Sequence, residues 1–199
     1  IHFIFLSEMI AQILFLVRLV FAYYNLEDYS GYYITNTALS DDITQILRMS
    51  GLGPIRSNYV NRRPSTIAIK VLPGDDLALI KLMFTPNISK ELYLQLDGEP
   101  YLQNDDDVGM VTVVSSFDGN ILKSISEDTK GVQVVHEWYL ANPDVLQYRL
   151  TAVKGGQELS GIRVLDRSDA PHFGHARTND DTRFPPFVGM SLPQEFNMI

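Results

Sequence analysis

The sequence predicts an all-β fold: a ten-stranded antiparallel up-and-down barrel with a helix-turn-helix lid between its first two strands. Apolar and polar residues alternate along most of the chain, which is typical of strands with one buried face. Turn sequences separate these runs, among them Pro73-Gly74-Asp75-Asp76 and Asn142-Pro143-Asp144. One segment near the start, residues 40–61, has helical spacing instead.

The predicted strands follow one another through short turns, so each is expected to pair with the next as a hairpin. Such a meander closes into a barrel, because closure removes exposed edge strands. Ten strands enclose more volume than their own side chains fill, which predicts a container for a ligand. The ten segments are 29–37, 65–72, 77–84, 91–96, 100–103, 110–116, 121–126, 132–140, 145–153 and 157–165.

The helical segment has start and stop signals of its own. Ser40 is a residue type that caps helices, and Asp41 and Asp42 suit the first turn of a helix over 40–50. The sequence Gly51-Leu52-Gly53-Pro54 ends this helix, and residues 55–61 predict a second short one.

Both ends of the chain lie outside the predicted barrel, which covers residues 25–167. Residues 1–22 form a hydrophobic targeting segment, and Val20-Phe21-Ala22 resembles a signal-peptidase site, so we expect a secreted protein. The alternatives are a membrane anchor containing Arg18, or an upstream stretch absent from a cytoplasmic protein that starts at Met9. Residues 168–199 contain prolines and no sustained period, which predicts a disordered tail.

Composition excludes several classes of function. A hydrophobic fraction of 45% excludes a disordered chain, and a net charge of -8 makes nucleic acid an unsuitable partner. The chain has no cysteine, so it forms no disulfide and offers no thiolate to a metal. No catalytic triad, phosphate-binding loop or dinucleotide fingerprint occurs. The run 105–107 lacks the ligand spacing of a calcium loop and predicts a solvated turn, so we expect no metal and no cofactor.

Six short motifs occur in this order along the chain: Tyr29-Ser30-Gly31-Tyr32-Tyr33, Gly51-Leu52-Gly53-Pro54-Ile55-Arg56, Pro64, Leu96-Asp97-Gly98-Glu99-Pro100-Tyr101, Asp118-Gly119-Asn120-Ile121-Leu122 and Arg163-Val164-Leu165-Asp166-Arg167. Together they resemble the intracellular lipid-binding proteins, the family of fatty-acid-binding and cellular retinoid-binding proteins. The resemblance covers about residues 26–167 and implies a non-enzymatic, monomeric carrier of a long-chain fatty acid or similar hydrophobic ligand. It also implies that the helical lid moves to admit the ligand and touches membranes transiently.

The resemblance also implies ligand-binding residues, since many members hold a carboxylate with two arginines and a tyrosine. Arg163 matches one arginine, while Leu165 replaces the tyrosine and His136 the second arginine. Arg149 restores a second cation only if its face of strand 145–153 lines the cavity, which the sequence leaves open. Phe84 matches a gating phenylalanine of the family. For Arg163 and His136 the alternatives are a structural ion pair and a hydrogen-bonded interior histidine.

Three rival functions stay open at this point. A secreted lipocalin-like carrier fits the first 22 residues, although its helix would lie near the C-terminus. A membrane-tethered interaction module would use the same residues as its anchor. An enzyme using His136 with Glu137 or Arg149 is disfavoured, because His136 and Glu137 are adjacent in a strand and point to opposite sides.

Overall fold

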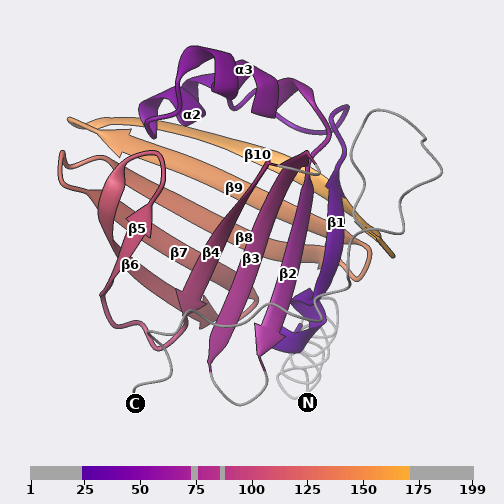
Figure 1. Ribbon diagram of the computed structural model, residues 1–199. Coiled ribbons are helices and arrows are strands. Elements are labelled where there is room, and N and C mark those ends of the chain that lie inside the picture. The colour runs from indigo at the N-terminus through magenta and orange to yellow at the C-terminus, as the bar shows by residue number, and fades with distance from the viewer. Residues whose placement is uncertain (1–23, 73–75, 86–87, 171–199) are drawn as a thin grey trace, which may run out of the picture.

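A computed structural model describes residues 24–72, 76–85 and 88–170, and it confirms the predicted fold class. Ten antiparallel strands curl into a half-barrel, and two short helices lie between the first two strands (Figure 1). The targeting segment 1–22, and the tail from residue 171 onward, fall outside the described residues. No helix of the described part of the chain is long and apolar enough to cross a membrane.

The elements follow the predicted order, with small shifts at their ends. The first motif begins in a short 3-10 helix and not in a strand, and the last strand continues into the segment predicted as tail. The elements are η1 (Leu26–Tyr29), β1 (Gly31–Thr35), α2 (Thr44–Met49), α3 (Pro54–Arg62), β2 (Thr66–Leu72), β3 (Leu77–Thr85), β4 (Ile88–Gln95), β5 (Tyr101–Asp105), β6 (Gly109–Asp118), β7 (Ile121–Asp128), β8 (Gln133–Asn142), β9 (Val145–Lys154) and β10 (Gln157–Ser168).

One sheet contains all ten strands, in the order β4-β3-β2-β1-β10-β9-β8-β7-β6-β5. The chain closes on itself through β1, where Tyr33 lies opposite Ile67 of β2 and Arg167 of β10. The two ends of this order, β4 and β5, meet through side chains. The Tyr101 hydroxyl donates a hydrogen bond to the Tyr93 carbonyl oxygen at 2.6 Å across that seam.

Alternating burial along the strands identifies the face that points into the barrel. On β9, Leu146, Tyr148 and Leu150 are buried, whereas Arg149 between them is exposed. On β10, Arg163 and Leu165 are both buried. The sequence left open which face of β9 points into the barrel. The structure shows that the face with Leu146, Tyr148 and Leu150 points inward and that Arg149 points outward.

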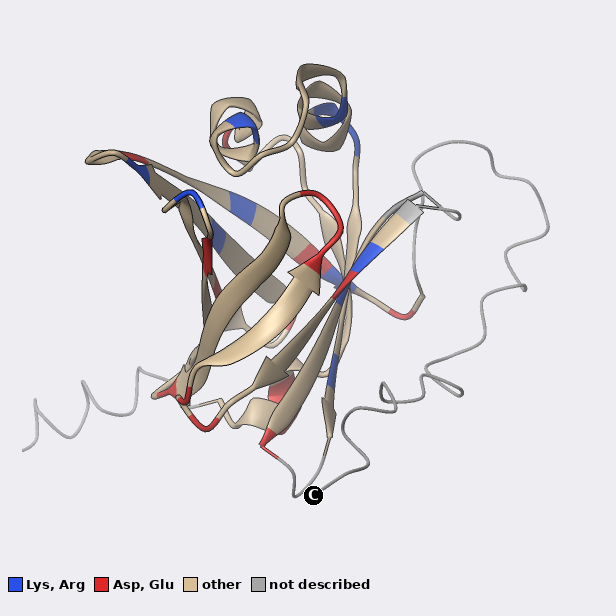
Figure 2. Ribbon diagram, turned by 60° about the vertical axis from the view of Figure 1, so that its left-hand side comes forward, with Lys and Arg blue, Asp and Glu red and all other residues tan. Residues whose placement is uncertain are grey.

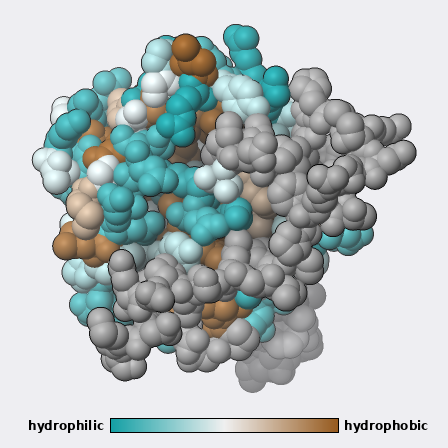
Figure 3. Space-filling view, viewed as in Figure 1, coloured by the Kyte–Doolittle hydropathy of each residue, from teal (hydrophilic) through white to brown (hydrophobic). Residues whose placement is uncertain are grey.

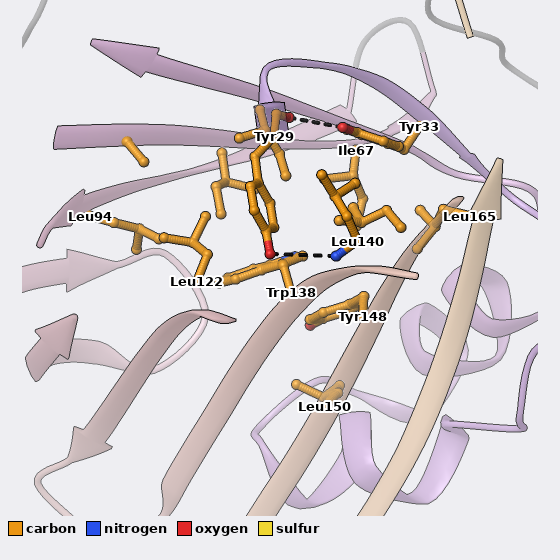
Figure 4. Close-up of a cluster of buried hydrophobic side chains, with 14 of the residues drawn as sticks. Tyr29, Tyr33, Ile67, Leu94, Leu122, Trp138, Leu140, Tyr148, Leu150 and Leu165 are labelled. Atoms are coloured by element: carbon orange, nitrogen blue, oxygen red, sulfur yellow. Dashed lines mark hydrogen bonds between the residues drawn. The ribbon is translucent and has the colours of Figure 1, made fainter. Parts of the chain in front are cut away.

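The end of the barrel opposite the helices is filled by a dense apolar core (Figure 4). Trp138, Leu122 and Leu165 have no exposed surface there, and neither does Tyr29 of η1. The Tyr29 hydroxyl accepts a hydrogen bond from the Leu140 amide at 3.4 Å, which anchors η1 across the bottom of the barrel (Figure 4). Among the described residues, the barrel interior therefore keeps its open volume toward the helical end.

Helices α2 and α3 cover the other end and form what we call the helical lid (Figure 1). The predicted start of the first helix is wrong: it begins at Thr44, and the Ser40 hydroxyl donates to the Asn36 carbonyl oxygen at 2.7 Å instead of capping a helix. Helix α2 packs directly on β10, because a Cβ added to Gly161 would lie 3.0 Å from Ile43. A glycine at this position therefore permits the close approach of lid and barrel.

Candidate functional site

A cavity of about 330 Å³ lies between the helical lid and the barrel wall. Most of its surface is aliphatic, and its walls come from both helices of the lid and from strands on both sides of the β4–β5 seam. Aliphatic side chains that line it include Leu47, Leu52, Leu82, Leu92, Val134 and Leu150. A volume of this size, with a few polar groups among apolar walls, is typical of a small-molecule site.

Two polar side chains of the inner wall, His136 on β8 and Tyr148 on β9, form a pair. The His136 Nδ1 atom and the Tyr148 hydroxyl lie 2.8 Å apart, and both rings stack with Trp138 at centroid distances of 5.5 and 5.4 Å. Burial, and to a lesser extent the charge of Lys90, lowers the pKa of His136 to about 3. Burial also raises the pKa of Tyr148. Both groups are therefore uncharged at neutral pH.

Charged residues gather where the lid meets the β5–β6 turn. Lys90 Nζ lies 2.6 Å from Asp105 and 3.7 Å from Asp107, and Arg56 of α3 forms an ion pair with Asp107. We call these four residues the ion-pair cluster. Burial raises the pKa of Asp105, but the hydrogen bond and charge of Lys90 outweigh this effect and hold that pKa below its usual value. Figure 2 shows the ribbon of the acidic turn, in red, beneath the two lid helices, on which basic positions are blue.

This arrangement corrects the prediction of a solvated turn at 105–107. The side chains of Asp105 and Asp107 are only 16% and 11% exposed, because each is paired with a cation. Within the described ranges no group of three or more His, Asp or Glu side chains could hold a metal ion. The turn therefore fastens the lid to the barrel through Asp107, while Asp106 between the two paired carboxylates is exposed.

Arg163 is buried, with 4% of its surface exposed, but it is not among the residues that line the cavity. Its Nη1 donates to the carbonyl oxygen and to Oδ1 of Asn61 at the end of α3, at 3.3 and 3.4 Å. The same Asn61 Oδ1 accepts a hydrogen bond from the Ile43 amide at 2.9 Å. The Nε atom of Arg163 has no hydrogen-bond partner among the described residues. Burial lowers the pKa of Arg163, and Tyr148 opposes that shift.

The other predicted site residues lie apart from the cavity or beyond what is described. Arg149 points outward, and its Nη1 lies 3.7 Å from Glu137 on the outer face of β8. Leu165 belongs to the apolar core at the closed end. Phe84 is in β3, and its side chain falls outside the described residues. The structure therefore brings His136 to the cavity and leaves Arg149 and Leu165 out of it.

Sequence reasoning missed Tyr148 and Lys90. Tyr148 lies on the face of its strand opposite Arg149, and its partner His136 lies on the neighbouring strand, so only the strand register joins the two. Lys90 precedes the predicted strand 91–96 but belongs to β4, where it shares the inner face with Leu92 and Leu94. Because side chains alternate between the two faces of a strand, extending the predicted strand back to residue 90 would have placed Lys90 on the inner face.

Solved structures of other proteins have a fold similar to that of this chain. Lipid binding protein 8 of Caenorhabditis elegans matches with a TM-score of 0.62 at 15% identity, over 74% of this chain and 100% of its own. The Schistosoma mansoni fatty acid binding protein in complex with arachidonic acid matches with 0.58 at 15%, over 72% and 98%. The fluorescent protein UnaG matches with 0.57 at 18%, over 72% and 100%. No protein-family model and no curated protein matches.

The fold and the covered cavity define a lidded β-barrel of the ligand-enclosing kind. The matched structures have this same fold, and they confirm the resemblance to the intracellular lipid-binding proteins. They also contradict the prediction of secretion, because the fold that they share with this chain is that of the intracellular lipid-binding proteins. The hydrophobic character of residues 1–22, on which that prediction depended, belongs to a segment outside the described residues.

Proposed function

We propose that this chain is a non-enzymatic carrier that binds a long-chain fatty acid or a similar hydrophobic molecule inside its barrel. The observation that carries the proposal is the cavity of about 330 Å³, whose lining is mostly apolar and includes the His136–Tyr148 pair. Two of the matched proteins are a lipid binding protein and a fatty acid binding protein, which supports the same class of ligand.

Burial of an alkyl chain supplies the affinity. Each methylene that leaves water gains about 0.8 kcal/mol, so about ten methylenes gain about 8 kcal/mol. This gain is comparable with the cost of association, about 4–15 kcal/mol. A short acyl chain therefore binds weakly, and affinity increases with chain length until the cavity is full.

The polar contacts divide into direct and indirect ones in this proposal. His136 faces the ligand, together with Tyr148. Arg163 contributes indirectly, because it holds the end of α3 through Asn61 and thereby positions the lid. The alternative of an enzyme that uses His136 with Glu137 is disfavoured. Glu137 lies on the outside of the barrel, where it pairs with Lys123 at 3.1 Å.

Transport requires an exchange step at the helical lid. Ile55 of α3 is 84% exposed although it also lines the cavity, and apolar residues are visible at the helical end of the surface (Figure 3). Basic residues lie on both helices, Arg48 on α2 and Arg56 and Arg62 on α3 (Figure 2). We propose that the carrier acts as a monomer and that this end touches anionic membranes during exchange. Sedimentation with anionic vesicles should decrease for Ile55→Asp.

Calorimetric titration of the delipidated full chain with fatty acids of increasing length tests the carrier. We expect one site and affinity that increases with length. Val134→Trp fills the cavity and should weaken binding at least about tenfold, whereas Val135→Trp, on the outer face of the same strand, should not. Equal binding by the two folded variants, or affinity independent of chain length, would overturn the proposal.

A further inference from the structure

The His136–Tyr148 pair offers the interior of the cavity both a hydrogen-bond donor and an acceptor, without a net charge. If the Tyr148 hydroxyl donates to Nδ1, then Nε2–H of His136 remains a donor and the Tyr148 oxygen keeps a lone pair. If Nδ1–H donates instead, the Tyr148 O–H remains a donor and Nε2 an acceptor. The pair therefore matches a group that both donates and accepts, as a hydroxyl does.

The charges that line the cavity do not favour an anion. Two basic side chains face four acidic ones there, which leaves an excess of two negative charges: Arg56 and Lys90 against Asp105, Asp106, Asp107 and Asp128. Both basic residues are already engaged in the ion-pair cluster. The inward-facing Arg163 is not part of the lining, and it donates to Asn61. A carboxylate bound beside His136 would lose its hydration, and the two cations that line the cavity are already paired with aspartates, so this binding is costly.

We propose that this cavity selects lipids with an uncharged, hydroxyl-bearing head over fatty acid anions of the same chain length, and that the His136–Tyr148 pair is the head-binding site. The inference rests on the proposed carrier function and specifies its ligand class. The alkyl chain occupies the aliphatic walls, while the hydroxyl donates to one member of the pair and accepts from the other.

Displacement of Nile red, an uncharged probe, by oleyl alcohol and by oleic acid at pH 7 compares two ligands that differ only in the head. We expect the wild-type chain to bind the alcohol at least about tenfold more tightly. Tyr148→Phe removes one hydroxyl and keeps the ring, so it should weaken alcohol binding about fivefold and leave acid binding within about twofold. Tyr139→Phe is the matched control, since its hydroxyl pairs with Gln147 on the outer face.

A second variant tests the charge argument from the opposite side. Asp105→Asn removes a partner of Lys90, so acid binding should become tighter and the preference for the alcohol should narrow. Acid binding as tight as alcohol binding in the wild-type chain, or equal losses for both ligands in Tyr148→Phe, would overturn the inference and leave the carrier function intact. If Nile red and both lipids fail to bind, the carrier function itself fails.

Discussion

At the scale of single residues, His136 joins the site to the stability of the fold. Its pKa is about 3 in the folded protein, against 6.5 for an ordinary histidine. Between these two values the unfolded chain binds more protons than the folded one. The free energy of unfolding must therefore decrease as the pH falls through this window, and the effect is complete near pH 3.

We predict that His136→Gln flattens part of the acid-dependent loss of stability. Between neutral pH and about pH 4.5, the free energy of unfolding should fall by about 2–3 kcal/mol more in the wild-type chain than in the variant. This figure follows because pH 4.5 lies about two units below the ordinary histidine pKa, and each unit corresponds to about 1.4 kcal/mol. Urea unfolding of both chains at a series of pH values measures this difference. Asp105, Asp42 and Glu91 have lowered pKa values and act in the same direction, but they are common to both chains. Parallel stability curves would contradict the prediction.

Arg167 shows that the closing motif of the sequence has a structural role. Its guanidinium donates to the carbonyl oxygens of Pro143, Ser30 and Asp28 at 2.7, 3.0 and 2.6 Å, and to the Tyr33 hydroxyl at 2.6 Å. One planar group therefore joins η1, β1 and the β8–β9 turn.

Replacement of Arg167 by lysine should destabilise the fold, because an ammonium group cannot reach four acceptors in one plane. We expect a loss of about 2 kcal/mol in the free energy of unfolding. Arg149→Lys, a matched change at an outward-facing arginine, should stay within about 0.5 kcal/mol. Denaturant titrations of the two variants make the comparison, and equal losses would argue against a special role for Arg167.

At the scale of elements, the helical lid is fixed at one end and fastened by charges at the other. At the fixed end, Asp41 exchanges two hydrogen bonds of 2.8 Å with Ile162 of β10. At the other end Arg56, whose side chain is 63% exposed, pairs with Asp107. An exposed ion pair contributes little stability, about 0–1 kcal/mol, so this end opens more easily.

A covalent link between α3 and the β5–β6 turn should therefore slow ligand exchange. The chain has no cysteine, so Arg56→Cys with Asp107→Cys supplies the only two thiols for a short bismaleimide. We expect stopped-flow release of a bound fluorescent ligand to slow several-fold after linking. The same variant with both thiols blocked separately is the control. Unchanged release rates after complete linking would rule out opening at this edge.

At the scale of the whole molecule, the barrel has one weak line, the seam between β4 and β5. Strands β9 and β10 pair with a neighbour on both sides, whereas β4 and β5 stand at the ends of the sheet order. The seam is held by side-chain contacts such as Tyr101 to Tyr93 and Lys90 to Asp105.

Native-state hydrogen exchange should follow this difference. Amides of β4 and β5 should exchange faster than those of β9 and β10, because local opening at the seam breaks fewer interactions. A bound lipid contacts residues on both sides of the seam, so it should slow exchange there more than in β9 and β10. Uniform protection across all ten strands would contradict this prediction.

The strand order followed from the sequence because each turn joins neighbours that pair locally. Which face of each strand points into the barrel was harder to predict from the sequence. For strand 145–153 both faces carried residues that suit an interior, and the register of β8 and β10 settled that Tyr148 points inward and Arg149 outward. Pairing between distant elements, such as Arg56 with Asp107, leaves no local pattern in the sequence.

The sequence by itself determined the ten strands, the helical lid and the container, because alternation and turn residues act over a few neighbouring positions. Only the tertiary structure decided which polar groups meet in the cavity. It placed His136 beside Tyr148, engaged Lys90 with Asp105 and turned Arg163 to Asn61. The physical reason is that hydrogen bonds and ion pairs depend on distances within a few ångströms, which strand register and lid packing set together.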